Sequence, residues 1–300
     1  MTAAPASVRL RSFAKINLAL SVLGRRSDGF HEIRTVLQSI DLSDQLELRP
    51  CETLRLCASG YATIESLPPE QNLVWKAALA LSRACAPGRG ADITLRKRIP
   101  PGAGLGGGSG NAAATLLGLQ RLWGLEIPPD ELRAIAASLG SDVPFFLEGG
   151  TALGVGLGEE VYPLPDLAAT ALAVVFPGVE IQTAEAYRLL SLGLTSERNA
   201  NRIGSFCRHL ASGAGCLTEI FNDFEAAILP AYPAVADARS FLQQRGAAAA
   251  LLCGSGSSVF GFFSEEESAL AVSRGVVRET WRAFPAKTLS RTDYLQRMFE

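Results

Sequence analysis

Residues 100–114 read PPGAGLGGGSGNAAA, and the rest of the chain can be arranged around this stretch. Six of the nine residues from Gly102 to Gly110 are glycine, which lets the backbone adopt positive φ angles and approach a ligand closely. The flanking patterns predict a strand over residues 91–99 and a helix over residues 111–123. A glycine loop that leads into a helix offers unpaired N–H groups and the positive end of the helix dipole. We interpret it as a phosphate-binding loop, with a plain flexible connection as the alternative.

We compared the loop with three known nucleotide-binding patterns, and it matches only the dinucleotide-binding pattern, in part. No lysine follows the glycines, so the Walker pattern is absent. Gly102, Gly104 and Gly107 do spell GxGxxG, which keeps an NAD-dependent dehydrogenase as an alternative. A dinucleotide-binding unit needs a second parallel strand after the helix, whereas residues 128–139 predict another helix. The protein-kinase signatures Val-Ala-Ile-Lys and His-Arg-Asp do not occur.

The order of strands and helices predicts an α+β protein with two lobes, because it lacks a strict βαβ rhythm. Two prolines within residues 163–166 suggest a boundary, which gives domains of residues 1–163 and 164–300. Residues 152–161 predict one glycine-containing strand, and residues 268–280 predict a helix, followed by a last strand and a tail. A second glycine turn, Gly254–Ser258, either closes a site from the second lobe or is a simple hairpin.

Composition excludes several classes of protein. The 300 residues are 48% hydrophobic and 19% charged, which predicts a folded chain. A net charge of −2 argues against a nucleic-acid binder, and no apolar run is long enough to span a membrane. The six cysteines, Cys216 among them, form no CxxC, and only two histidines accompany them. We therefore expect reduced thiols, no dedicated metal site and a cytoplasmic protein that is a monomer or a weak homodimer.

Three polar residues are candidates for chemistry. Alternation over residues 13–24 places Lys15 and Asn17 on one face of a strand. Lys15 is either a solvated surface lysine or the partner of a carboxylate. Asp142 lies just before Val143-Pro144, where a carboxylate can cap a helix or act as a general base. The residues alone leave both alternatives open.

Four stretches together resemble the GHMP kinase superfamily. The loop resembles its second motif, and LLCGSGSSVFGFF at residues 251–263 resembles its third. FAKINLALSVLGRRSDGFHEI at residues 13–33 and LGSDVPFFLEGG at residues 139–150 are more particular. They resemble the branch that acts on 4-diphosphocytidyl-2-C-methyl-D-erythritol in non-mevalonate isoprenoid synthesis. The resemblance runs from residue 12 to residue 263 and is thinnest between residues 163 and 252.

The resemblance implies a two-lobed fold and a reaction. The N-terminal lobe would be ribosomal-S5-like, the C-terminal lobe ferredoxin-like, and the active site would lie between them. ATP, accompanied by Mg²⁺, would phosphorylate the 2-hydroxyl of the small-molecule substrate, with no residue set aside as a metal ligand. Asp142 would act as the catalytic base and Lys15 would balance charge.

The resemblance also assigns binding residues. The ATP phosphates would lie against Gly102, Gly104, Leu105, Gly106, Gly107, Gly108 and Ser109, and the base or ribose against Asn72 and Lys97. The substrate would contact Asn17, Phe30, His31, Thr183 and Tyr187. The plainer alternatives are an N-cap for Asn72, an exposed strand lysine for Lys97, a turn cap for His31, and core packing for Phe30 and Tyr187.

The chain departs from the family pattern at two positions. Phe30 stands where a tyrosine is usual, and Gly110 where a second serine is usual. Three rival functions remain, namely a GHMP kinase that acts on homoserine or mevalonate, the NAD-dependent dehydrogenase, and a binding protein without catalysis. The GFHEI segment at residues 29–33 favours a cytidine substrate, because its histidine can read the polar edge of a base.

Overall fold

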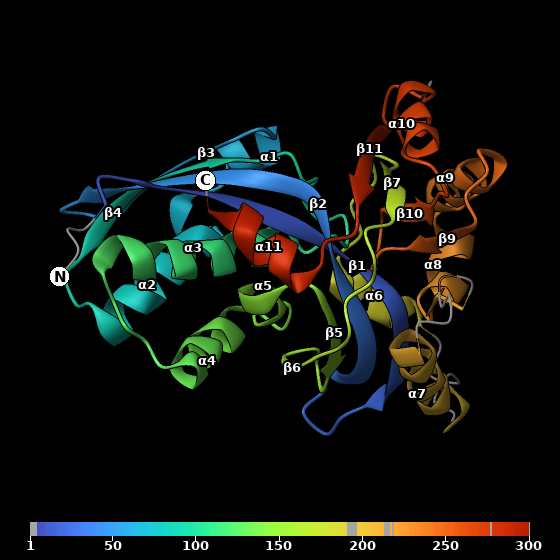
Figure 1. Cartoon of the computed structure of the whole chain (residues 1–300), viewed down its shortest axis with the longest axis horizontal. Coiled ribbons are helices and arrows are strands. Elements are labelled where there is room, and N and C mark those ends of the chain that lie inside the picture. Colours follow the sequence, from blue (N-terminus) through green and yellow to red (C-terminus); the bar gives the residue numbers. More distant parts are fainter. Residues whose placement is uncertain (1–4, 191–196, 213–216, 218, 277, 300) are drawn as a thin grey trace.

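The computed structural model of the chain describes residues 5–190, 197–212, 217, 219–276 and 278–299, and it shows two lobes side by side (Figure 1). The long antiparallel hairpin of β1 and β2 runs through the first lobe and reaches the second. Among the described residues, seven strands form the first sheet: β1 (Val8–Arg25), β2 (His31–Cys51), β3 (Arg55–Ser59), β4 (Gly90–Arg96), β5 (Thr151–Val155), β6 (Glu160–Pro163) and β8 (Phe221–Asn222).

One face of this sheet is covered by helices, as the apolar spacing predicts (Figure 1). They are α2 (Leu73–Cys85), α3 (Gly107–Trp123), α4 (Pro129–Leu139) and α5 (Phe145–Glu148). Two short elements, α1 (Ala62–Glu65) and η1 (Pro69–Gln71), lead from β3 into α2. Helix α3 lies against β1 and α2, with most of its residues buried. The glycine loop is thereby held between β4 and α3, at the end of the first lobe that faces the second.

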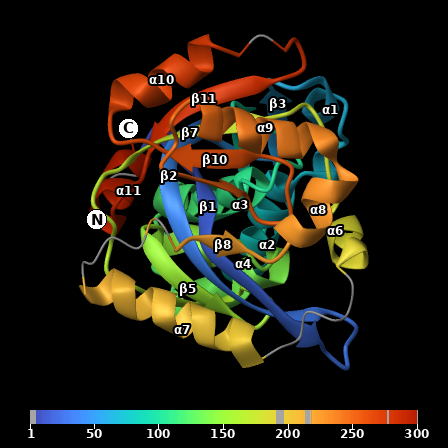
Figure 2. The same cartoon turned by 90° about the vertical axis from the view of Figure 1, so that its right-hand side faces the viewer.

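The second lobe has its own antiparallel sheet, in the order β11-β7-β10-β9 (Figure 2). Its elements are β7 (Ala171–Phe176), α6 (Thr183–Leu189), α7 (Glu197–Ser212), α8 (Glu225–Ala231), α9 (Pro233–Gln244), β9 (Ala249–Leu252), β10 (Val259–Phe262), α10 (Glu266–Arg274) and β11 (Arg282–Lys287). This strand order, with α9 before β9 and α10 before β11, is the ferredoxin-like arrangement. The two-lobed α+β prediction is therefore confirmed.

The last helix, α11 (Arg291–Met298), returns to the first lobe. The ring of Tyr294 lies 5.4 Å from that of Phe13, and its hydroxyl donates to the carbonyl oxygen of Phe146 at 2.6 Å. The first hydrophobic core thus contains residues from both ends of the chain. The division at 163/164 stays a prediction, and it separates α11 from the lobe on which it packs.

Four expected boundaries were wrong. The strand predicted over residues 91–99 ends at Arg96. Helix α3 begins at Gly107 rather than at residue 111, so part of the glycine stretch is its first turn. Two strands, β5 and β6, replace the single strand over residues 152–161, because Gly156 and Gly158 adopt positive φ and reverse the chain. Helix α10 ends at Arg274 rather than at residue 280.

Two further expectations concern the cysteines and the membrane. Five cysteines have free thiols in the described residues, namely Cys51, Cys57, Cys85, Cys207 and Cys253, whereas Cys216 lies outside them. In the described part of the chain, no helix combines the length and the apolar character that crossing a membrane requires.

Candidate active site

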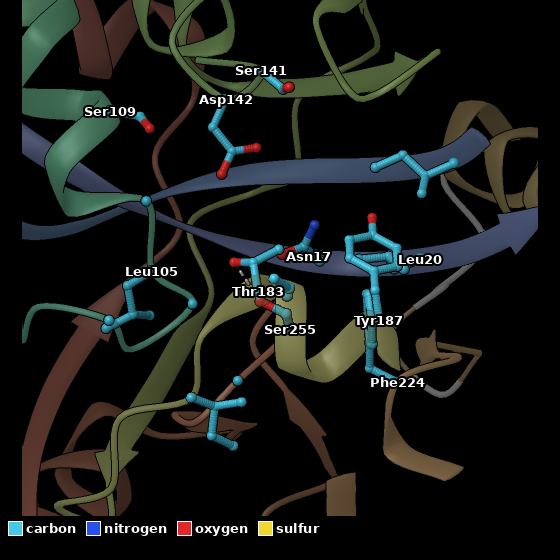
Figure 3. Close-up of a pocket in the computed structure, with 18 of the residues that line it drawn as sticks. Asn17, Leu20, Leu105, Ser109, Ser141, Asp142, Thr183, Tyr187, Phe224 and Ser255 are labelled. Atoms are coloured by element: carbon cyan, nitrogen blue, oxygen red, sulfur yellow. Dashed lines mark hydrogen bonds between the residues drawn. The ribbon is translucent and has the colours of Figure 1, made fainter. Parts of the chain in front are cut away.

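A cleft of about 1190 Å³ lies between the lobes (Figure 3). Its walls come from the glycine loop, the tip of the β1–β2 hairpin, Ser141 and Asp142, helix α6 and the turn at residues 254–256. Figure 3 shows Leu105 and Ser109 on one side of the cleft and Tyr187 on the other, with Asp142 between them. Segments far apart in the sequence therefore share one cavity.

The glycine loop presents the N-terminus of α3 to this cleft. Gly106 has φ of 67° and precedes the helix, and no side chain caps the first turn. The N–H groups of an uncapped first turn need a partner, and the helix dipole makes an anion the favoured one. The loop is held in place by two backbone bonds, from Lys15 N to Leu105 O at 3.0 Å and from Ser258 N to Ala103 O at 3.1 Å. This geometry suits a phosphate group.

Lys15 and Asp142 form an ion pair at the centre of the cleft. Lys15 Nζ lies 3.5 Å from Asp142 Oδ2 and donates to Asn17 Oδ1 at 2.9 Å. Asn17 is itself oriented by its bond from Nδ2 to Thr35 Oγ1, at 2.8 Å. The lysine side chain is 5% exposed and that of Asp142 is 37% exposed. Asn17 thus holds the buried ammonium of Lys15 in place, and the carboxylate of Asp142 is accessible from the cleft.

The structure excludes one of the two roles considered for Asp142. The residue at the N-cap of α5 is Pro144, and no side chain caps that helix. The capping alternative is therefore wrong. The solvated alternative for Lys15 is also wrong, because its side chain is buried. A carboxylate beside a fixed ammonium can accept a proton while the positive charge stabilises negative charge that develops nearby.

Aromatic rings form the far end of the cleft. The rings of His31 and Tyr187 stack with centroids 4.6 Å apart and planes 14° apart. Phe224 meets Tyr187 edge-on at 4.9 Å. Burial, with the nearby charge of Asp142, raises the pKa of Tyr187 to about 12. Burial, with a smaller contribution from the charge of Arg25, lowers the pKa of His31 from its ordinary value. Both rings are therefore neutral near pH 7 and suit a flat, polar-edged group.

The second lobe contributes the turn at residues 254–256. Asn222 Nδ2 donates to Leu252 O at 2.9 Å and to Gly254 O at 2.7 Å, which fixes the start of the turn. Thr183 Oγ1 lies 3.3 Å from Ser255 Oγ across the cleft wall. The turn joins the antiparallel strands β9 and β10 as a hairpin and also lines the cavity from the second lobe. Contact of this turn with a ligand stays a prediction.

Family models match both lobes. The description "GHMP kinases N terminal domain" fits residues 72–150, which hold the glycine loop and Asp142, and "GHMP kinases C terminal" fits residues 198–283. The chain belongs to the GHMP kinase family.

Comparison with individual proteins shows which members of the family this GHMP kinase resembles. It is 46% identical over 267 residues to the 4-diphosphocytidyl-2-C-methyl-D-erythritol kinase of Solibacter usitatus, covering 86% of this chain and 82% of that protein. A crystal structure of 4-(cytidine 5'-diphospho)-2C-methyl-D-erythritol kinase aligns with a TM-score of 0.77 and 34% identity, over 93% of this chain and 98% of that one. Homoserine kinase from Cytophaga hutchinsonii has a TM-score of 0.75 at 20% identity, over 97% and 96% of the two chains, and shares the fold.

Most of the residues predicted for the site line the cleft of this GHMP kinase. They are Lys15, Asn17, Phe30, His31, Gly102, Gly104, Leu105, Gly106, Gly107, Gly108, Ser109, Asp142, Thr183 and Tyr187. Phe30 stands at the mouth with 61% of its surface exposed, so it is no core residue. The structure brings these side chains together, and their roles stay predictions.

Asn72 and Lys97 do not line the cleft. The side chain of Asn72 caps α2 by accepting from Val74 N at 3.0 Å, as the plainer alternative predicted. Lys97 is not an exposed strand lysine, because its side chain is 4% exposed. Its ammonium lies behind the loop, where it donates to Asp44 Oδ2 at 2.5 Å and to Asn111 Oδ1 at 2.9 Å. Contact of these two side chains with a nucleotide stays a prediction.

A side chain at position 110 would point away from the cleft. A Cβ at this position would approach Phe13 O to 2.9 Å and Ser12 Oγ to 3.0 Å. A serine here would therefore face β1 rather than the cleft. The absence of the family's usual hydroxyl at position 110 thus removes no side chain from the cavity wall.

Sequence reasoning missed several residues of the site. Arg25, Thr35, Arg188 and Phe224 all line the cleft. The Arg25-Arg26 pair beside a turn is a visible charge signal, whereas a threonine in a strand and a phenylalanine before a helix are ordinary core residues in a sequence. Asn222, which orients the second turn, carries no pattern of its own.

Proposed function

We propose that this GHMP kinase transfers the γ-phosphoryl group of ATP to the 2-hydroxyl of 4-diphosphocytidyl-2-C-methyl-D-erythritol. The observation that carries the proposal is the Lys15–Asp142 pair, which lies between an anion-binding helix N-terminus and a pair of stacked rings. A phosphate donor fits on one side of the pair and a nucleobase on the other. The activity for which the relatives are named agrees with this arrangement.

The transfer itself needs few groups. With ATP on the loop, the substrate hydroxyl attacks the γ-phosphorus, an oxygen–phosphorus bond forms, and the bond to the β-phosphate oxygen breaks as ADP leaves. Asp142 accepts the hydroxyl proton, because its carboxylate is open to the cleft. Lys15 and the first-turn N–H groups of α3 stabilise the charge on the transferring group. Asn17 keeps the ammonium in place through its bond to Lys15.

The substrate end of the cleft matches a cytidine diphosphate. The base would stack on Tyr187 after the imidazole of His31, which covers that ring, moves aside, and neutral His31 can then donate to or accept from its polar edge. Arg25 and Arg188 line the same end, and each guanidinium suits a diphosphate oxygen. Homoserine or mevalonate would leave these rings and charges without partners. The cleft thus favours the cytidine substrate over those of the rival kinases.

Magnesium fits this cleft as an ion that enters with ATP. Among the described residues, no group of three acidic, histidine or cysteine side chains is placed to hold a metal. Asp142 and the Ser109 hydroxyl are oxygen donors beside the loop, which is the sparse set that Mg²⁺ takes when phosphates and waters fill its other positions. The ion would neutralise charge on the phosphates. We propose that the enzyme acts in the cytoplasm, as a monomer or a weak homodimer.

Acceptor competition tests the proposal. Purified protein with ATP and Mg²⁺ is offered the cytidine substrate, homoserine and mevalonate separately, and ADP release is measured. We expect kcat/KM for the cytidine substrate to exceed the other two by at least a hundredfold, because only it fills the ring and arginine end of the cleft. Faster turnover of homoserine or mevalonate would refute the substrate assignment. Binding of the cytidine substrate with no ADP release above background would indicate the non-catalytic alternative.

A further inference from the structure

Both ends of the glycine loop are tied to one buried carboxylate, that of Asp44 in β2. Oδ1 accepts from the backbone N–H of Arg98 at 2.7 Å and of Ile99 at 2.8 Å, at the entry to the loop. Oδ2 accepts from Asn111 Nδ2 at 2.9 Å, in the second turn of α3 beyond the loop. The side chain of Asp44 has no exposed surface. A single side chain thus joins the two segments between which the loop runs.

The backbone at the loop entry needs such an acceptor. The ladder between β2 and β4 ends where Gln45 pairs with Arg96. Residues 100 and 101 are prolines without N–H groups, so Arg98 and Ile99 carry the last backbone donors before the loop. Asp44 takes the place of the missing ladder for both donors. Without it, the N–H groups of Arg98 and Ile99 would lose their acceptor in the sheet.

Lys97 completes the arrangement. Its Nζ donates to Asp44 Oδ2 at 2.5 Å and to Asn111 Oδ1 at 2.9 Å, and Asn111 Nδ2 also donates to Ser12 Oγ at 3.0 Å. The buried charges are therefore paired, and both oxygens of Asp44 and both polar atoms of Asn111 are bonded. Buried ion pairs are tolerated when they are satisfied in this way, and removal of one partner is costly.

We infer that Asp44, Lys97 and Asn111 are positioning residues, which set the distance between the ends of the glycine loop and thereby its affinity for a nucleoside triphosphate. The inference rests on the proposed function, since it takes the loop to be the ATP site. None of the three side chains lines the cleft. They act through the backbone of residues 98–111, and this role of Lys97 does not depend on the predicted contact of its side chain with a nucleotide.

A charge swap tests the inference. Asp44→Asn places an amide N–H₂ against the ammonium of Lys97, and Asn111→Asp places two carboxylates side by side. In the double variant Asp44→Asn/Asn111→Asp, the amide at 44 still accepts from Arg98 and Ile99 and donates to the carboxylate at 111, which pairs with Lys97. The double variant therefore restores the bond between positions 44 and 111 and gives Lys97 a carboxylate partner again at position 111, while the bond from Lys97 to position 44 stays lost. Glu225→Gln is the matched control, because Glu225 also accepts a backbone N–H, from Leu252, and pairs with Arg239 away from the loop.

Two readouts are measured on the full chain. Hydrogen–deuterium exchange reports the loop amides of residues 102–110, and calorimetry reports the affinities for a non-hydrolysable ATP analogue with Mg²⁺ and for cytidine diphosphate. We expect Asp44→Asn to speed exchange in the loop and weaken the ATP analogue roughly tenfold to a hundredfold, as for lost bonds to a buried charge. Cytidine diphosphate affinity should stay within about twofold. The double variant should recover a large part of both properties, and Glu225→Gln should retain them.

Each contrary result has one meaning. Unchanged loop exchange in Asp44→Asn overturns the positioning role, whatever the affinities are. Equal losses for both ligands, or a double variant no better than the single ones, show a merely structural role and also overturn it. If the native protein fails to bind the ATP analogue while loop exchange still responds to Asp44→Asn, the proposed function fails, and the tie between Asp44 and the loop stands without a role in nucleotide affinity.

Discussion

His31 lies flat on Tyr187, with ring centroids 4.6 Å apart and planes 14° apart, and so covers the face of the tyrosine. Phe224 meets the same tyrosine edge-on. A cytosine that stacks on Tyr187 has to take the place of the imidazole or lie beside it. His31 is the first residue of β2 and follows the exposed Phe30 at the hairpin tip.

Tyr187→Leu should therefore weaken substrate binding. Loss of base stacking costs about 1–3 kcal/mol, which corresponds to a KM for the cytidine substrate raised about tenfold, with the KM for ATP little changed. Tyr187→Phe is the control, because it keeps the ring. Steady-state kinetics with each substrate varied separately measures both values. A raised KM in the phenylalanine variant and not in the leucine variant would exclude stacking as the role of Tyr187.

Asp142→Asn should abolish most turnover while ligands still bind. The amide keeps the shape of the side chain but does not accept the hydroxyl proton, so we expect kcat to fall by roughly 10²–10⁴. Steady-state ADP release measures turnover, and calorimetry with cytidine diphosphate shows that the cleft is intact. If kcat falls less than about threefold, Asp142 only aligns the hydroxyl, because a loose phosphoryl-transfer transition state needs little help from a base.

Gly104→Ala should disturb the contact between the lobes. Gly104 has φ of 76°, and a Cβ there would overlap the carbonyl oxygen of Cys253 in the second lobe. Gly246→Ala is the control, because φ is 85° there and a Cβ would meet no atom within 4 Å. The backbone cost of about 1–2 kcal/mol applies to both variants. Urea unfolding should show a larger loss of free energy for Gly104→Ala, which should also lose kinase activity. Equal losses of unfolding free energy in the two variants would mean that the close contact between Gly104 and Cys253 does not stabilise the protein.

Acid should destabilise the protein through His31. Its pKa is lowered from 6.5, so the unfolded chain binds this proton more readily than the folded chain. The contribution is complete above the unfolded pKa and is lost as the pH falls below about 6.5 through the folded pKa. The free energy of unfolding, measured in urea between about pH 7.5 and about pH 5.5, should fall less in His31→Gln than in the native protein. His209→Gln leaves the His31–Tyr187 stack intact, so its free energy of unfolding should fall with acid as much as that of the native protein. Parallel pH profiles for native protein and His31→Gln would contradict the shift.

Local features of this protein could be predicted because adjacent residues determine them. Glycines between residues 102 and 110 permit the positive φ angles of the loop, and the side chain of Asn72 reaches the second N–H of its own helix. Alternation along β1 placed Lys15 and Asn17 on one face for the same reason. The resemblance of four motifs added the lobes and the chemistry, and the site residues that it named gather in one cleft, apart from Asn72 and Lys97.

Other features depend on segments that meet only after folding. Residues 291–298 look like a polar tail, yet Tyr294 and Met298, four residues apart, reach the first core. Asp44 is charged, and charged residues are almost never fully buried unless they are paired, so nothing near it in the sequence indicates its position. Its partners are at positions 97–99 and 111. Sequence patterns therefore determined the loop, the cap and the strand faces. Tertiary packing alone decided which charges were buried together, because those partners are distant in the sequence and meet only when the chain folds.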